Sequence, residues 1–148
     1  MLTADRTLLR KMGPRRAMFA GPVAAGAALF RGSIAAVCAD GTLVPAGIQS
    51  PLFAPVAILG IAKHQQLPAS GGLVTGDFVG SSTAVECETG CFALPFDTAP
   101  SWANKGQPVY AVDDQTVSLT QTPSGGTARL QVGVFAGLDV DGTPYVEI

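Results

Sequence analysis

Few side chains in this sequence are of the types that carry out catalysis, and their spacing does not suit it. The chain of 148 residues has one histidine, His64, so any Ser-His-Asp triad would have to use it. No serine stands in a Gly-x-Ser-x-Gly elbow, and both Gly32-Ser33 and Gly80-Ser81-Ser82 are typical of turns. The sequence therefore gives no support to nucleophilic catalysis, and we expect a protein that is not an enzyme.

Three pairs of carboxylates are candidates for general acid–base chemistry, and each has a structural explanation. The first pair is expected to cap backbone amides in a tight turn, and the second flanks another turn. The third alternates with apolar residues, so its side chains should point to solvent. The pairs are Asp113 and Asp114, Asp139 and Asp141, and Glu86 and Glu88.

Metal and cofactor chemistry is not indicated either. Cys87-x-x-x-Cys91 lacks further ligands at zinc spacing, and Cys38 is the only other cysteine. Three cysteines are an odd number, which does not suit a disulfide-stapled secreted domain. Asp139-x-Asp141-Gly142 does not continue into an EF-hand loop. We expect buried thiols, no metal and no cofactor.

Two aromatic residues are candidates for binding. Trp102 lies in the polar stretch 97–106, and Tyr110 lies in the apolar run that follows it. Together they could stack on a sugar, as in a carbohydrate-binding β-sandwich. A single tryptophan beside a loop more often covers a core or anchors an interface, and we favour that interpretation.

Charge is unevenly distributed along the chain. Residues 1–31 hold six basic residues against Asp5, whereas residues 32–148 hold three basic and ten acidic residues. A basic arm on an acidic body indicates an acidic partner surface, such as another copy of the chain. Nucleic acid is disfavoured, because no aromatic residues alternate with the basic ones and phosphate would repel the body. The arm's basic residues other than Arg31 are the candidate partner-binding residues Arg6, Arg10, Lys11, Arg15 and Arg16, to which we add Trp102.

The elements that must position these residues are short β-strands. The chain has 18 glycines and 11 prolines without a period, which excludes helical bundles and collagen. Only 14% of residues are charged, and mean hydropathy is positive at +0.35, which excludes an ordinary disordered chain. Turn signals recur every 8 to 12 residues or so, as in sandwiches and barrels. The expected strands are 33–38, 42–45, 56–62, within 77–88, 91–96, 108–112, 116–120, 128–135 and 144–148.

Details within this pattern sharpen the expectation. Residues 33–45 predict a hairpin closed by Asp40-Gly41, and the continuous apolar run 56–62 predicts a strand covered on both faces. Gly133 predicts a bulge or a close approach within its strand. The predicted fold is one all-β domain, sandwich- or barrel-like, of short antiparallel strands, with an extended arm over residues 1–16 and the domain over residues 17–148.

The apolar run 17–30 imitates a secretion signal, because basic residues precede it and small residues end it. Gly21-Pro22 and Gly26 interrupt the run, and it is too short to cross a membrane. We expect it to belong to the folded domain, with no membrane association.

Five stretches, taken in order, form the most specific pattern. They are Gly32–Val37 with Asp40–Ala46, Leu59–Ala62, Val85–Pro95, Trp102–Val117 and Val132–Ile148. In this order they resemble small capsid cement, or head decoration, proteins of tailed phages and prophages. The resemblance covers roughly residues 17–148, whereas the first 16 residues depart from the shorter start of many members.

The resemblance implies a structural protein of the virion, assembled in the host cytoplasm. It implies binding to the outer surface of the capsid and clamping of neighbouring major capsid protein subunits. It also implies association with other copies of the chain, a trimer being favoured over a dimer. The sequence leaves two alternatives open: a secreted carbohydrate-binding β-sandwich with Trp102 and Tyr110 as its platform, or a component of head or tail fibres.

Overall fold

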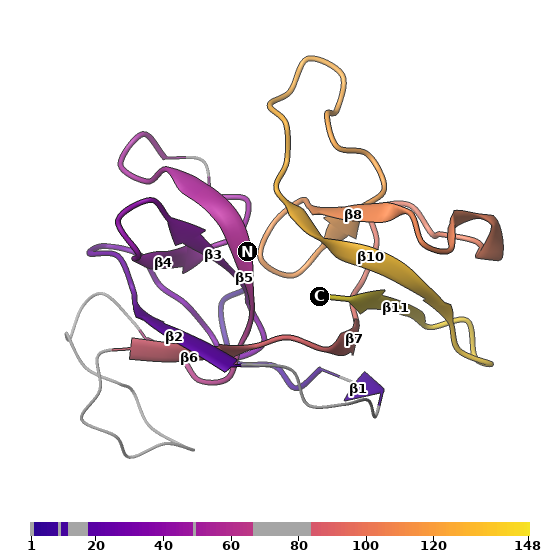
Figure 1. Ribbon diagram of the computed structural model, residues 1–148, viewed down its shortest axis with the longest axis horizontal. Helices are drawn as coiled ribbons and strands as arrows, with labels where there is room; N and C mark the ends of the chain where they lie inside the picture. The colour runs from indigo at the N-terminus through magenta and orange to yellow at the C-terminus, as the bar shows by residue number, and fades with distance from the viewer. Residues whose placement is uncertain (1, 9, 12–17, 49, 67–83) are drawn as a thin grey trace.

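The chain folds into two packed antiparallel β-sheets (Figure 1). The computed structural model describes residues 2–8, 10–11, 18–48, 50–66 and 84–148. The predicted all-β class is confirmed, and the only helical element in the described residues is the 3-10 turn η2 (Trp102–Asn104). None of the helical residues in these ranges forms a segment that is long and apolar enough to cross a membrane.

Each sheet has a simple strand order. The six-stranded sheet, here sheet A, runs β1 (Arg10–Lys11), β7 (Cys91–Ala93), β11 (Pro144–Glu147), β10 (Gln131–Leu138), β8 (Pro108–Ala111) and β9 (Val117–Ser118). The five-stranded sheet, here sheet B, runs β2 (Met18–Pro22), β6 (Ala84–Glu88), β5 (Pro55–Ala62), β3 (Ile34–Cys38) and β4 (Leu43–Pro45).

The chain passes directly from sheet B to sheet A between β6 and β7. Gly90 turns the chain there with φ of 157°, and its backbone exchanges two hydrogen bonds with Ile148. In Figure 1 the two sheets consequently appear as left and right halves joined by this stretch.

Two apolar clusters account for the packing of sheet B. The larger cluster lies between the sheets, with Ile34 and Ala36 of β3 contributing from one side and Phe92 and Phe135 from the other. The smaller one lies on the opposite face of sheet B and includes Ala35. Because successive side chains of a strand point to opposite faces, β3 is buried on both, which explains its uninterrupted apolar sequence.

Sheet B also curls towards closure. After β2, Val23 forms a parallel bridge with Leu43 of β4, and the Ala24 amide donates to the Leu43 carbonyl at 2.9 Å. The two outer strands of the sheet therefore meet at one end. The predicted sandwich thus includes a barrel-like half.

The structure confirms several details of the sequence pattern. Residues 33–45 form the hairpin β3–β4, and the pairing of β10 with β8 shifts register between Gln131 and Gly133, where the bulge was predicted. Glu86 and Glu88 of β6 are partly exposed, whereas Val85 and Cys87, which alternate with them, are buried.

Several strand predictions were wrong in part: the strand predicted over 91–96 ends at Ala93, and the strand predicted over 116–120 covers only Val117–Ser118. The run 56–62 is fully covered only at its carboxyl end, because Val56 and Ala57 extend beyond the packed region and are exposed. The strand predicted over 128–135 starts at Gln131 and continues to Leu138. Its extent is set by pairing with β11, and not by where its apolar sequence ends. The part of the predicted strand region before Ala84 lies outside the described residues.

The first residues of the chain lie against the domain. Leu2 is buried, Leu8 packs on the larger cluster, and β1 pairs with β7 at the edge of sheet A. In its described part, the segment predicted as an extended arm is therefore docked on the protein's own surface.

Candidate interaction surfaces

Trp102 is a large apolar side chain that is exposed and yet held in place. It lies in η2 with 58% of its surface exposed. Its ring covers Gly137 of β10, where a Cβ atom would lie 2.8 Å from the indole, and Gly137 has φ of +142°. The Lys105 ammonium lies 5.7 Å from the ring centroid. The ring is thus fixed against backbone on one side and open to solvent on the other.

The loop beneath Trp102 is tied together by local hydrogen bonds. Asn104 Oδ1 accepts from the Ser101 amide at 2.9 Å and from its hydroxyl at 3.1 Å. The Gly106 amide donates to the Phe135 carbonyl, and the Phe135 amide donates to Gln107. These bonds attach the loop to β10, so the ring's position is set before any partner arrives.

Trp102 and Tyr110 do not form a common platform. Tyr110 pairs with Gln131 at the start of β10, whereas Trp102 covers Gly137 near its end. Six residues of strand separate these positions by about 20 Å. One sugar ring cannot stack on both side chains.

A buried carboxylate receives the N-terminal segment. Asp114 is 1% exposed, and its two oxygens accept from the Leu2 amide at 2.9 and 3.2 Å. The Ser33 hydroxyl donates to the same carboxylate at 3.0 Å, and the Ile34 amide donates to the Asp114 carbonyl at 2.7 Å. Asp114 therefore joins three segments far apart in sequence, and its role here is structural.

Arg6, predicted to bind a partner, is used within its own chain. Its guanidinium donates to the carbonyls of Gly32 at 3.1 Å and Gln115 at 3.3 Å. Burial lowers the pKa of Arg6, and the charges of Asp114 and Asp113 oppose that shift. Partner binding by Arg6 stays a prediction, and two of its donor groups already serve carbonyls of its own chain.

The other predicted basic residues are only partly located. Arg10 and Lys11 pair through their backbones with Phe92 and Cys91 in sheet A. Their side chains, together with Arg15 and Arg16, lie outside the described part of the chain. Partner binding by these four residues stays a prediction.

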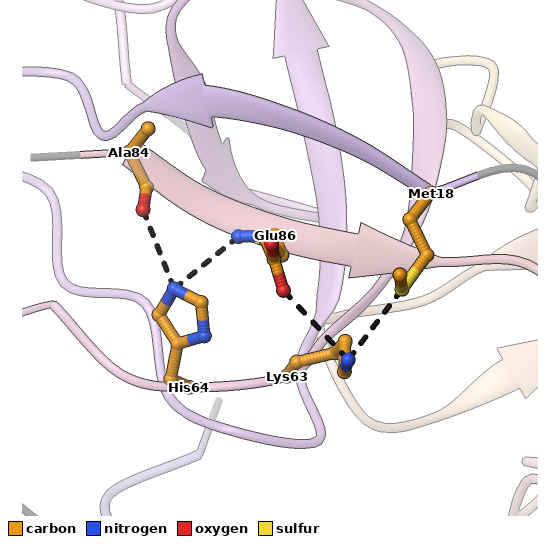
Figure 2. Close-up of polar contacts among 5 residues, drawn as sticks. All are labelled: Met18, Lys63, His64, Ala84 and Glu86. Carbon is orange, nitrogen blue, oxygen red and sulfur yellow. Dashed lines mark hydrogen bonds and ion pairs between the residues drawn. The ribbon is translucent and has the colours of Figure 1, made fainter. Parts of the chain in front are cut away.

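His64 is engaged by backbone groups (Figure 2). Its Nε2 lies 3.3 Å from the Ala84 carbonyl and 3.3 Å from the Glu86 amide, which donates to it. Beside it, Lys63 Nζ lies 3.7 Å from a Glu86 carboxylate oxygen and 3.4 Å from Met18 Sδ. The ring ties the segment after β5 to the start of β6, which is a structural role.

The remaining candidate groups also serve the fold. Asp113 accepts from the amides of Gln115 and Thr116, as predicted, and these bonds lower its pKa although burial opposes them. Burial raises the pKa of Cys87 to about 12, so its thiol is kept protonated. Within the described ranges, no three His, Cys, Asp or Glu side chains are grouped so that they could hold a metal ion.

Sequence reasoning missed several exposed apolar side chains, and those at two places bear on binding. Met18 and Phe19 are more than half exposed on β2, an outer strand of sheet B. Val140 is fully exposed at the tip of the β10–β11 hairpin. The tip had a detectable signal, because Asp139-Val140-Asp141 puts an apolar residue between two acids inside a turn.

Comparisons with models of known protein families, with curated proteins and with solved structures found no match to this chain.

Proposed function

We propose that this protein is a structural capsid decoration protein of a tailed phage or prophage. It binds the outer surface of the head and clamps neighbouring major capsid protein subunits, which stabilises the shell. The proposal starts from the resemblance of its five sequence stretches to that family. The fold class agrees with this role, and the surface supplies the means of contact.

The observation that carries the proposal is the exposed, immobilised ring of Trp102. A tryptophan that is fixed on a scaffold and open to solvent loses little entropy on binding, and such residues dominate interface energies. Here the loop hydrogen-bonded to β10 provides the scaffold, and Gly137 provides the seat. A clamp needs such an anchor more than it needs ionisable chemistry.

A second surface supports the same function. Met18 and Phe19 lie on an outer strand, and a strand at a sheet edge can accept another strand through its backbone groups. The proposed binding surface therefore has an aromatic anchor on sheet A and an apolar edge on sheet B.

The docked N-terminal segment changes what the arm contributes. Leu2 and Leu8 help to build the domain, so removing residues 1–16 would damage the fold as well as any binding. Point variants are the better test of the arm. In the proposal, Arg10, Lys11, Arg15 and Arg16 remain the arm's candidate contacts with an acidic partner.

Cosedimentation with heads that lack their decoration protein tests the proposal. The heads come from a phage that encodes this chain. We expect the wild-type chain to sediment with them to saturation. Trp102→Ala should weaken binding by about 2 kcal/mol, roughly thirtyfold, because an interface anchor is lost. Leu52→Ala is the matched control, since Leu52 is also an exposed large apolar residue but lies beside the β3–β4 turn, and not in η2 or on β2.

Absence of binding by a folded wild-type chain would overturn the proposal. If Trp102→Ala and Leu52→Ala weakened head binding equally, Trp102 would not be the anchor of the interface. Binding to a glycan array with no binding to heads would favour the carbohydrate-binding alternative, which the separation of Trp102 from Tyr110 disfavours.

A further inference from the structure

The tip of the β10–β11 hairpin carries residues that its turn does not need. In this turn the Asp139 amide donates to the Thr143 carbonyl, the Gly142 amide donates to the Asp139 carbonyl, and Gly142 has φ of 85°. Asp141 Oδ1 accepts from the Thr143 amide at 2.9 Å. None of these bonds involves the side chain of Val140.

The β3–β4 hairpin makes the same turn without such a residue. Cys38, Gly41 and Thr42 form the equivalent backbone bonds, and Asp40 Oδ1 accepts from the Thr42 amide at 3.0 Å. The position of Val140 is occupied there by Ala39. A valine with a relative exposure of 103% between two acids is therefore not required by the turn, and its whole side chain is accessible to a partner.

A cleft elsewhere on the molecule has the complementary character. It has a volume of about 190 Å³ and lies where the docked N-terminal segment, the turn before β3 and the end of β5 meet. Cavities of about 150 Å³ accept benzene, and the isopropyl group of valine is smaller. Its apolar lining residues are Leu8, Ile61, Ala62 and Phe92, and its charged ones are Arg6, Arg31, Lys63 and Glu88.

The charged side chains that line the cleft favour a negatively charged binding partner. Three of its four charged side chains, those of Arg6, Arg31 and Lys63, are positive. Lys63 pairs with Glu86 at 3.7 Å, but both side chains are more than a third exposed. Such a surface pair contributes little, so Lys63 can turn to an incoming carboxylate at small cost.

We infer that the hairpin tip of one copy inserts into this cleft of a second copy. Val140 enters the apolar part, and the carboxylates of Asp139 and Asp141 face the cationic rim. This matches the division of the chain into a basic start and an acidic remainder. The inference goes beyond the proposed function, because association between copies needs no capsid.

The tip cannot reach the cleft of its own chain. The hairpin is fixed relative to the cleft, since Phe92 of the cleft lies on β7 and pairs with Val146 of β11, while the other lining residues come from the N-terminal segment, the turn before β3 and sheet B. Asp141 is five residues further along the hairpin from Val146, or about 16 Å. A contact between two different patches is head-to-tail, so it closes into a ring or propagates.

Sedimentation velocity of the purified full-length chain over a range of concentrations tests the inference. We expect concentration-dependent association that weakens with added salt. Asp141→Lys should weaken it at least about tenfold, and Val140→Ala should also weaken it. Asp40→Lys is the matched control, because it loses the same kind of turn hydrogen bond and should associate like the wild type.

Charge exchange identifies the cleft as the acceptor. Lys63→Glu should weaken association, the double variant Lys63→Glu with Asp141→Lys should restore it, and Lys105→Glu serves as the control outside the cleft. Circular dichroism reports whether each variant is folded. If the Lys63→Glu variant is not folded, the inference is tested by comparing association of the Asp141→Lys and Asp40→Lys variants.

Two results would overturn the inference: a wild-type chain that stays monomeric at every concentration, or equal association of the Asp141→Lys and Asp40→Lys variants. Head binding is measured separately on the same samples. Association without head binding would contradict the proposed function alone, and head binding by a strictly monomeric chain would contradict this inference alone.

Discussion

The β3–β4 and β10–β11 hairpins close with the same three residues, Asp-Gly-Thr, and make the same backbone bonds. In the first, the strand that follows is buried at once, since Leu43, Val44 and Pro45 are all covered. In the second, the tip projects from sheet A, and Val140 is fully exposed. Figure 1 shows the first hairpin within sheet B and the second extending from the right-hand end of sheet A.

This difference shows that the hydrogen bonds that form a turn do not determine whether the turn is buried or exposed. An aspartate oxygen that bonds the amide two residues on, followed by a glycine with positive φ, is enough to make the turn. Whether the turn then packs or projects depends on which strands lie beside it. β4 meets the chain after β2 through Leu43, whereas the turn after β10 continues past its neighbours.

The largest difference between the hairpins should appear when the residue after each threonine is truncated. Leu43 is fully buried in the smaller cluster, so Leu43→Ala should destabilise the fold by about 3 kcal/mol. Pro144 is only partly buried, and Pro144→Ala should cost less than about 1 kcal/mol. Urea unfolding measures both, and equal costs would contradict the assignment of one packed and one projecting hairpin.

This contrast also marks how far the sequence could predict the structure. Both Asp-Gly turns were predictable, because their bonds join residues within five positions of each other. The burial of Asp114 was not, since its partner Leu2 is 112 residues away and any aspartate in a tight turn resembles a surface cap. Trp102 was recognised as a candidate from its type and its loop. Its seat on Gly137 depends on a strand thirty-five residues later.

A smaller and equal effect is expected at the two turn glycines. Gly41 and Gly142 have φ of 83° and 85°, and a Cβ on either would meet no atom within 4 Å. Alanine at each position should therefore cost about 1 kcal/mol, from backbone conformation alone. A marked inequality in urea unfolding would show that one turn is held by contacts that the other lacks.

The smallest effect concerns the two turn aspartates, Asp40 and Asp141. Their pKa values should differ only because Asp141 has a second carboxylate nearby. Hydrogen bonds from the threonine amide two residues on lower the pKa of both Asp40 and Asp141 below 3.8. The charge of Asp139 opposes this at Asp141, whereas Asp40 has Cys38 in the equivalent position. In dilute solution, carbon NMR titration of the carboxyl groups should place the pKa of Asp141 above that of Asp40.

The sign of the stability effect follows from the lowered pKa values. Each aspartate stabilises the fold above its unfolded pKa, near 3.8, and this contribution is lost as pH falls through the lower folded value. Asp40→Asn and Asp141→Asn should therefore reduce the loss of stability on acidification below pH 4. At concentrations where copies associate, the cationic cleft should lower the pKa of Asp141 further and leave that of Asp40 unchanged. If the pKa values of Asp40 and Asp141 shifted equally, solution conditions would explain the change, and not contact of Asp141 with a second copy.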